Sequence, residues 1–219
     1  MNTSITSDQL FRALKETLTM VGFSLFFASL IGIPIGILLV VTRPGGILAN
    51  KWVYGILNPV INVVRSLPFI ILLVAIIPFT RLIVHTSVGT SAAIVPLILY
   101  IAPYIGRLVE NSLLEVNPGI LEAAEAMGAT PFQVIWYFLL PEAFGSLILT
   151  MTTATIGLIG ATAMAGTVGG GGIGDLAISY GYQRFDTFVI LVTVAILVAF
   201  VQGIQSVGNR LARKARRES

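Results

Sequence analysis

Five stretches of about twenty apolar residues follow one another along this chain, and each is nearly free of charge. A stretch of that length can cross the hydrocarbon layer of a bilayer as an α-helix. Backbone groups in lipid need partners within their own segment or in a closed barrel, and these runs lack the alternation of barrel strands. The sequence therefore predicts an all-α membrane protein with five transmembrane helices. The expected spans are approximately 18–41, 56–79, 90–109, 143–168 and 187–207.

Composition supports the bilayer as the solvent of this chain. Of its 219 residues, 56% are hydrophobic and 11% are charged, whereas soluble domains carry about 25% charged residues. The chain has no cysteine and a single histidine, His85, so the sequence offers neither a thiolate metal site nor a histidine cluster. The first residues lack the features of a removable signal peptide, and we expect the first apolar run to remain in the protein.

The distribution of Lys and Arg predicts the orientation of the chain, with the N-terminus outside and the C-terminus in the cytoplasm. The residues that this orientation places on the cytoplasmic side are Arg43, Lys51, Arg107, Arg210, Arg213, Lys214, Arg216 and Arg217. The opposite side receives Arg12, Lys15, Arg81 and Arg184. The basic tail after residue 209 could also be a nucleic-acid arm, but a basic run directly after a span is more typical of an orientation signal. We therefore expect no nucleic-acid partner.

The longest connection, residues 110–142, falls on the cytoplasmic side and has the signals of two short helices. Asn117 is a plausible N-cap with Pro118 in the first helical position, and Gly128 suits the left-handed residue that closes a helix. Thr130 and Gln133 have the spacing of a capping box at the start of a second helix. That second helix is expected to end before Pro141.

The same connection carries the pattern Glu-Ala-Ala, three residues, Gly, nine residues, Phe138, one residue and Leu-Pro. This pattern resembles the cytoplasmic signature of ABC importer permeases, with Phe138 where the family usually has isoleucine. The resemblance implies a type I ABC importer permease fold, a single transmembrane domain over residues 1–219 and a coupling segment within residues 110–142. The coupling residues that it implies are Glu122, Ala123, Ala124, Met127, Gly128 and Pro141.

A short helix rich in alanine has a narrow profile, so it can lie in a groove of another protein and transmit movement. The alternative is that the helix merely caps the bundle. The chain contains no Gly-x-x-x-x-Gly-Lys-[Ser/Thr] loop for binding phosphate, which means that any ATPase must be a separate chain. No cofactor is expected in this chain, and ATP with Mg would be bound by the partner. We also find no pairing of a nucleophile with a base that would indicate a catalytic site.

Residues 166–175 are rich in glycine and contain a nominal dinucleotide-binding pattern. A dinucleotide fingerprint follows a strand, whereas this segment follows an expected membrane helix on the outer side. Flexible backbone at the external mouth of a pore is the better interpretation.

Other segments resemble the methionine branch of these importers, namely 16–18, 65–69, 102–103, 107–110 and 169–174. Such permeases form homodimers, bind two copies of a separate ABC ATPase and receive substrate from an extracytoplasmic binding protein. The resemblance therefore implies methionine import through the bacterial inner or plasma membrane. The main alternative is a permease for osmolytes such as quaternary amines, whose glycine-rich segment is similar. Few aromatic residues lie within the spans, and this favours methionine because quaternary ammonium groups bind in aromatic clusters.

Met164 is the candidate gate of the pore, on a helix face shared with Gly157 and Gly160. By analogy with the family, two such side chains related by a two-fold axis would close the outer end, and a flexible apolar side chain can seal against water and still move aside. The alternative is a small-residue packing face with Met164 as a gap-filler.

Arg65 is the main ionisable residue within an expected span, and such residues are functional candidates. It could neutralise a substrate carboxylate. It could also extend to the nearby cytoplasmic interface or bind free carbonyl groups near Pro68. Arg107 and Glu110, three residues apart, are expected to form a local ion pair.

Overall fold

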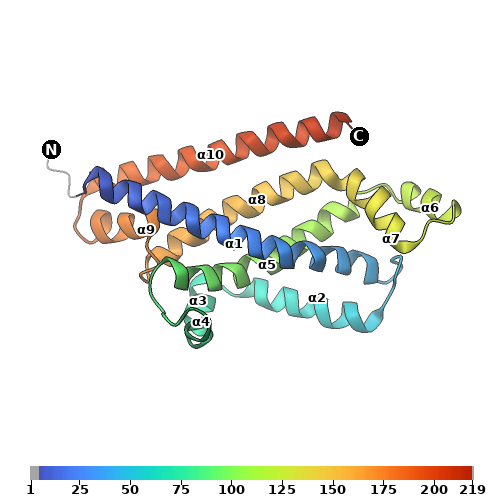
Figure 1. The fold of residues 1–219 in the computed structure, drawn as a ribbon, viewed down its shortest axis with the longest axis horizontal. Coiled ribbons are helices and arrows are strands. Elements are labelled where there is room, and N and C mark those ends of the chain that lie inside the picture. The colour runs from blue at the N-terminus through green and yellow to red at the C-terminus, as the bar shows by residue number, and fades with distance from the viewer. Residues whose placement is uncertain (1–4, 219) are drawn as a thin grey trace. The chain divides into compact units, whose positions relative to one another are not determined.

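The computed structural model of the chain describes residues 5–218, except for the side chains of Arg217 and Glu218. Every regular element in that range is a helix (Figure 1). In chain order these are α1 (Ser7–Thr42), α2 (Lys51–Ser66), α3 (Phe69–Ala75), α4 (Ile77–Val84), α5 (Thr90–Leu114), α6 (Pro118–Ala126), α7 (Pro131–Gln133), the π-helix η1 (Val134–Leu139), α8 (Leu140–Gly166), α9 (Gly172–Leu176), the π-helix η2 (Ala177–Tyr182) and α10 (Thr187–Glu218).

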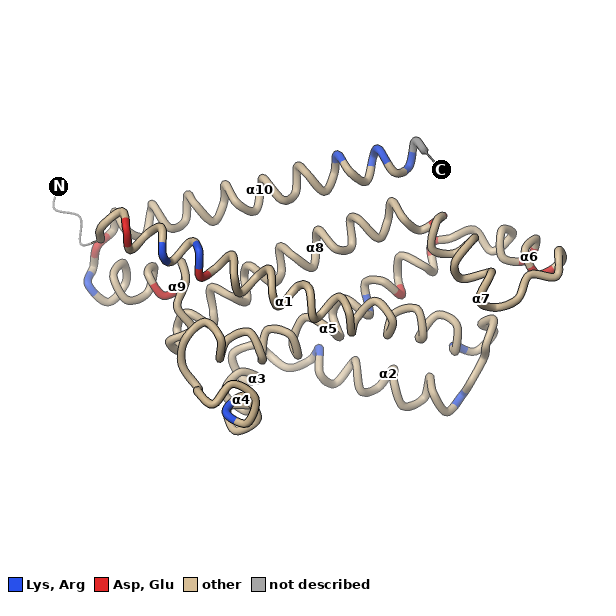
Figure 2. The backbone as a smooth tube through the Cα atoms, in the orientation of Figure 1, with Lys and Arg blue, Asp and Glu red and all other residues tan. Residues whose placement is uncertain are grey.

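Within residues 5–218, four helical stretches are long and apolar enough to cross a membrane, and a fifth results when α2 and α3 count as one broken span. The four are Ser7–Thr42, Thr90–Leu114, Pro131–Gly166 and Thr187–Arg216. The predicted all-helical fold with five apolar spans is thus confirmed. Long stretches of α1, α8 and α10 carry no charged residue, and the basic residues of α10 are confined to its C-terminal end (Figure 2). The orientation of the termini stays a prediction.

The second span is not the continuous helix that hydropathy predicts. The helix α2 ends at Ser66, and α3 begins after Pro68, whose backbone is extended with φ −58° and ψ 136°. Proline has no N–H to donate, and its ring disfavours helical backbone in the residue before it. A second break lies at Ile76, between α3 and α4. Average hydropathy is insensitive to both breaks.

The chain divides into two compact units, and each of the helices α1, α5, α8 and α10 contributes one segment to each unit. The first unit comprises the described residues of Met1–Ala28, together with Leu67–Ile101 and Thr155–Ile204. A small core of Ala13, Ile173 and Leu176 lies within it, where the start of α1 packs against α9. The expectation of one domain over residues 1–219 extends beyond the described residues and stays a prediction.

The second unit comprises Ser29–Ser66, Ala102–Ala154 and the described residues of Gln205–Ser219. Glycine allows α1 and α5 to approach closely here. A Cβ atom at Gly32 would lie 2.6 Å from the carbonyl oxygen of Ala102, and one at Gly36 would lie 2.6 Å from that of Gly106. Small residues let the backbones of membrane helices pack tightly. This packing matters in a bilayer, because lipid tails are as apolar as the side chains and no hydrophobic effect drives the helices together.

Candidate functional site: the coupling segment, the gate and the glycine loop

The first helix of the predicted coupling segment, α6, has the boundaries and caps that its sequence predicts. The Oδ1 atom of Asn117 accepts a hydrogen bond from the amide of Gly119 over 2.9 Å, and Pro118 occupies the first helical position. At the other end Gly128 has φ +78°, a conformation that L side chains rarely adopt. The amide of Ala129 donates to the carbonyl of Ala124 over 3.1 Å, which closes the helix.

The candidate coupling residues of α6 are exposed, with one exception. Glu122, Ala123, Met127 and Gly128 face solvent, and the side chain of Met127 is 70% exposed. Ala124 is fully buried, and α6 contacts η1. The helix is therefore anchored to its own unit through Ala124 and leaves its other faces free. An exposed helix with small side chains and one flexible methionine is suited to docking in a groove.

The second helix of the segment begins with the predicted capping box. The amide of Gln133 donates to Oγ1 of Thr130 over 3.4 Å, and the amide of Thr130 donates to Oε1 of Gln133 over 2.8 Å. The predicted end before Pro141 is wrong, because the helix continues through η1 into α8 and contains Pro141. The π-helical turn explains this result. Bonds there run between residues five apart, as from the amide of Leu140 to the carbonyl of Ile135, and the wider turn accommodates a residue that lacks an N–H.

The candidate gate residues lie on one exposed face of α8. Gly157, Gly160 and Met164 follow at intervals of three and four residues, and all three are exposed. Met164 is 52% exposed, and a Cβ atom built at Gly160 would meet nothing within 4 Å beyond the adjacent backbone of α8 itself. This face therefore does not serve as a packing face within the described part of the chain. It remains open to lipid, to a pore or to another chain.

The glycine-rich segment after α8, residues 166–172, is a hydrogen-bonded loop, and we call it the glycine loop. The sequence predicts flexible backbone here, whereas the structure ties the loop to its neighbours. The amide of Gly170 donates to the carbonyl of Ala165 over 3.0 Å, and the carbonyl of Gly169 accepts from the amide of Gly89 over 2.8 Å. Gly169, Gly171 and Gly172 have φ between +78° and +83°. Glycine is needed here for backbone conformation and close approach.

Two residues that sequence reasoning did not assign to a site hold the end of this loop. Oε2 of Glu16 accepts a hydrogen bond from the amide of Gly172, and Oγ1 of Thr17 accepts one from the amide of Ile173, each over 2.9 Å. Both acceptors come from α1, which lies beside α9 in Figure 1. In the sequence, residues 16–18 and 169–174 stand out only by their resemblance to the methionine branch. Nothing there indicates a contact between them, because the partner amides lie 156 residues away.

Arg65 lies exposed in the last turn of α2, with its Cζ atom 5.9 Å from the centre of the Tyr104 ring. That distance is at the outer limit of a cation–π contact. The contact gives the guanidinium a partner within the chain and favours a structural role. The alternative role with a substrate carboxylate stays a prediction.

Arg107 and Glu110 form the predicted ion pair, but the pair is part of a larger polar network. Nη1 of Arg107 donates to Oε2 of Glu110 over 2.5 Å, and both side chains are largely buried. Nη2 of the same guanidinium donates to Asn58 over 2.6 Å and to Asn62 over 2.9 Å. The network joins α5 to α2, a contact that spacing within α5 alone does not indicate.

Comparison with known proteins places this arrangement in a family. The sequence profile of the binding-protein-dependent transport system inner membrane component matches residues 20–216. A probable D-methionine transport system permease protein of Vibrio cholerae, MetI, is 47% identical over 211 residues, which cover 96% of this chain and 94% of that protein. The D-methionine transport system permease protein MetI of Escherichia coli strain K12 is 53% identical over 157 residues, or 72% of each chain.

Solved structures agree with the sequence comparison. A chain of the MetNI methionine ABC transporter, in a structure of its inward-facing conformations, superposes with a TM-score of 0.93 and 46% identity over 96% of this chain and 99% of that one. A chain of an amino acid ABC transporter solved with histidines superposes with a TM-score of 0.79 at 17% identity, over 95% of this chain and 94% of that one, and shares the fold. With a family profile that matches nearly its whole length and relatives that align over most of theirs, this chain belongs to the binding-protein-dependent transport system inner membrane component family.

Proposed function

We propose that this chain is the permease subunit of an ATP-driven importer for methionine or a close amino-acid relative. The observation that carries the proposal is the superposition of nearly the whole chain, at 46% identity, on a chain of the MetNI methionine ABC transporter. The relatives named for D-methionine transport favour this cargo over an osmolyte or quaternary amine. The chain is a transport subunit of the membrane and works without catalysing a reaction itself.

The working assembly in this proposal contains two copies of the chain, which together form the pore. Two copies of a cytoplasmic ABC ATPase bind below them and carry ATP and Mg, and an extracytoplasmic binding protein delivers the substrate. The N-terminus lies outside and the C-terminus in the cytoplasm, in agreement with the basic end of α10 (Figure 2). The remaining apolar surface contacts membrane lipid.

Coupling in this assembly runs through α6. Its exposed side, with Glu122, Ala123 and Met127, lies in a groove of the ATPase, and the left-handed turn at Gly128 sets the angle to the following helix. Closure of the two ATPase subunits on ATP moves the groove and α6 with it as a rigid body. Since α6 lies between α5 and α8 in the chain, the movement reaches the helix with the gate face. Met164 from each copy then closes or opens the outer end of the pore.

The test is transport by the reconstituted complex. The chain is placed in vesicles with its ATPase and candidate binding proteins, and ATP-dependent accumulation of labelled methionine and labelled glycine betaine is measured. We expect methionine uptake that requires both ATP and a binding protein. Uptake of betaine without uptake of methionine would contradict the proposed substrate. Uptake that does not require an ATPase would contradict the proposed ATP-driven mechanism.

The coupling role has its own variant. Gly128→Asp places a charged side chain on the exposed end of α6, where a groove of the ATPase would have to bury it. We expect the variant protein to insert and dimerise but to lose methionine uptake. Asn111, exposed on α5, provides the matched control, because Asn111→Asp adds the same charge outside α6. Unaltered uptake by Gly128→Asp would remove α6 from the mechanism.

A further inference from the structure

We propose that Glu16 and Thr17 are positioning residues that hold the glycine loop and α9 in place behind the gate, and we call the two together the α1 clamp. This inference rests on the proposed function, because it assigns the clamp a part in closing the transport pathway. The clamp would allow the outer end of the pore to remain shut between transport cycles.

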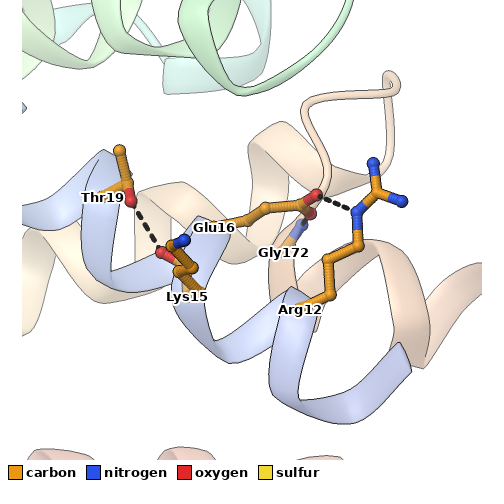
Figure 3. A network of polar contacts seen from close by, with 5 residues as sticks. All are labelled: Arg12, Lys15, Glu16, Thr19 and Gly172. Atoms are coloured by element: carbon orange, nitrogen blue, oxygen red, sulfur yellow. Dashed lines mark hydrogen bonds and ion pairs between the residues drawn. The ribbon is translucent and has the colours of Figure 1, made fainter. Parts of the chain in front are cut away.

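The clamp is made by two consecutive side chains that take two consecutive amides. Glu16 accepts from the amide of Gly172, and Thr17 accepts from the amide of Ile173, both over 2.9 Å. Thr17 is 2% exposed, and Ile173 is fully buried. Figure 3 shows the carboxylate of Glu16 directed at the amide of Gly172, with Arg12 on its other side. Nε of Arg12 lies 3.2 Å from Oε1 of Glu16, and the Arg12 side chain is 80% exposed.

The sequence around α9 explains why its cap comes from another helix. The first amides of any helix lack partners within that helix, and a side chain just before the helix usually accepts one of them. The residue in that position is Gly171, which has no side chain, and its φ of +78° with ψ −165° places the chain in a conformation that glycine alone adopts readily. The α1 clamp supplies the acceptors that the local sequence omits.

The glycines at the clamp are also required by space. A Cβ atom at Gly171 would lie 2.7 Å from Oε2 of Glu16, and one at Gly172 would lie 2.7 Å from Oγ1 of Thr17. Either distance is shorter than a van der Waals contact. The backbone of the glycine loop therefore lies directly against the side chains of α1. A larger residue at Gly171 or Gly172 would displace Glu16 or Thr17.

The held segment contacts the turn of α8 that contains the candidate gate. A Cβ atom at Gly174 would meet the backbone of Ala163, and one at Gly166 would meet the backbone of Asp175, so α9 lies against the last turns of α8 with no side chain between them. Met164 is in that turn, and its carbonyl accepts from the amide of Thr167 over 3.1 Å and from the hydroxyl of Thr167 over 2.7 Å. The chain of contacts runs from α1 through α9 and the glycine loop to Met164.

The experiment measures how well the gate closes. Vesicles containing the complete complex are loaded with labelled methionine in the absence of ATP, and the rate of efflux is followed. ATP hydrolysed per methionine imported is then measured in the same preparation. Thr17→Val keeps the shape of the side chain but removes the acceptor, Thr17→Ser retains it, and Glu16→Ala removes the carboxylate. Arg12→Gln is the control, since it removes the exposed ion pair and leaves both clamp bonds in place.

We expect efflux to rise about tenfold in Thr17→Val and in Glu16→Ala, the loss that follows when a buried amide loses its acceptor. ATP hydrolysed per methionine should rise with it, while Thr17→Ser and Arg12→Gln behave like the parent. A merely structural role would lower the amount of folded complex without changing efflux or coupling per complex. Parental efflux and coupling in folded Thr17→Val and Glu16→Ala would overturn the proposal, as would an Arg12→Gln variant as leaky as Glu16→Ala.

If Thr17→Val and Glu16→Ala give too little folded complex, Glu16→Gln decides the matter, because its neutral amide oxygen accepts a weaker hydrogen bond from the amide of Gly172 than the carboxylate does. A rise in efflux that is smaller than tenfold but clearly above Arg12→Gln supports the clamp, and no rise overturns it. Failure of the cargo assignment remains distinguishable. A parent complex that imports only glycine betaine refutes the proposed substrate, and the efflux assay is then run with betaine.

Discussion

Arg107 donates a hydrogen bond from Nη2 to Oδ1 of Asn58 over 2.6 Å, and this bond connects α5 to α2. The same guanidinium pairs with Glu110, whose side chain is 4% exposed. A buried ion pair of this kind contributes little by itself, because desolvation offsets much of the attraction between the charges. Removal of only one of the two charged side chains destabilises the protein strongly, because the other charge then remains buried without a partner. The bonds from Arg107 to Asn58 and Asn62 hold α2 to α5, and the pairing with Glu110 fixes the guanidinium that makes them.

Removal of Arg107 alone should destabilise the protein strongly. Arg107→Ala leaves the carboxylate of Glu110 buried without its cation, and we expect a loss of about 3 kcal/mol in the free energy of unfolding. The double variant Arg107→Met with Glu110→Leu should lose less of the free energy of unfolding, because neither charge remains buried. Thermal unfolding of the purified permease in detergent provides the comparison, and a double variant at least as unstable as Arg107→Ala would contradict this account.

The close approach of α1 and α5 predicts opposite effects for two glycines of α1. In Gly36→Ala the added methyl group would overlap Val109 and the carbonyl of Gly106, and we expect a loss of about 1–3 kcal/mol in stability. A Cβ atom at Gly22 would meet nothing within 4 Å beyond the adjacent backbone of α1 itself. Gly22→Ala should therefore be neutral, or stabilising by up to about 1 kcal/mol, because alanine favours the helix. Unfolding curves in detergent that give the two variants equal stability would be evidence against the tight contact.

The turn after α6 should tolerate side chains according to their backbone preference. The positive φ of Gly128 costs an L residue such as alanine about 1–2 kcal/mol, although a Cβ atom there would meet no described atom. Asparagine adopts this conformation more easily. We expect ATP-driven uptake to fall more in Gly128→Ala than in Gly128→Asn, at equal amounts of inserted protein. If uptake in the vesicle assay fell more in Gly128→Asn than in Gly128→Ala, the function of this turn would not depend on its positive φ.

Truncation of the candidate gate should make the pathway leaky. Met164→Ala removes the side chain that would meet its copy across the pore, and substrate efflux without ATP should rise several-fold, whereas Met164→Leu should remain close to the parent. Val198 on α10 is 54% exposed, nearly the same as Met164, and Val198→Ala serves as the matched control. Equal efflux from the alanine variants at the two positions would indicate that Met164 has no special part in closure.

The features that sequence reasoning predicts correctly are local ones. Asn117, Pro118 and Gly128 mark the two ends of α6 because caps depend on residues within one turn of the helix end. The ion pair of Arg107 with Glu110 follows from helical spacing. Family membership also confirms the predicted membrane transport subunit.

The features that sequence reasoning misses depend on distance in the chain or on individual backbone groups. Asn58 lies 49 residues before Arg107, and Gly172 lies 156 residues after Glu16, so no local pattern indicates either contact. Hydropathy does not reveal the break at Pro68, because it averages over side chains and ignores a missing N–H. Pro141 has the form of a stop signal in the sequence, whereas the π-helical turn before it keeps the helix continuous. The roles of Glu122, Met127, Arg65 and Met164 in transport stay predictions.

The π-helical turn at Val134–Leu139 determines what the deletion of one residue at this point of the chain would do. A π turn contains one residue more than the α-helical turn that it replaces, and the helix beyond it keeps nearly the same rotational phase. Deletion of one residue there would leave the following part of α8 facing the same way but would bring the ring of Pro141 against the carbonyl four residues before it. The extra residue lets a proline lie inside a continuous helix at the point where the coupling segment joins α8.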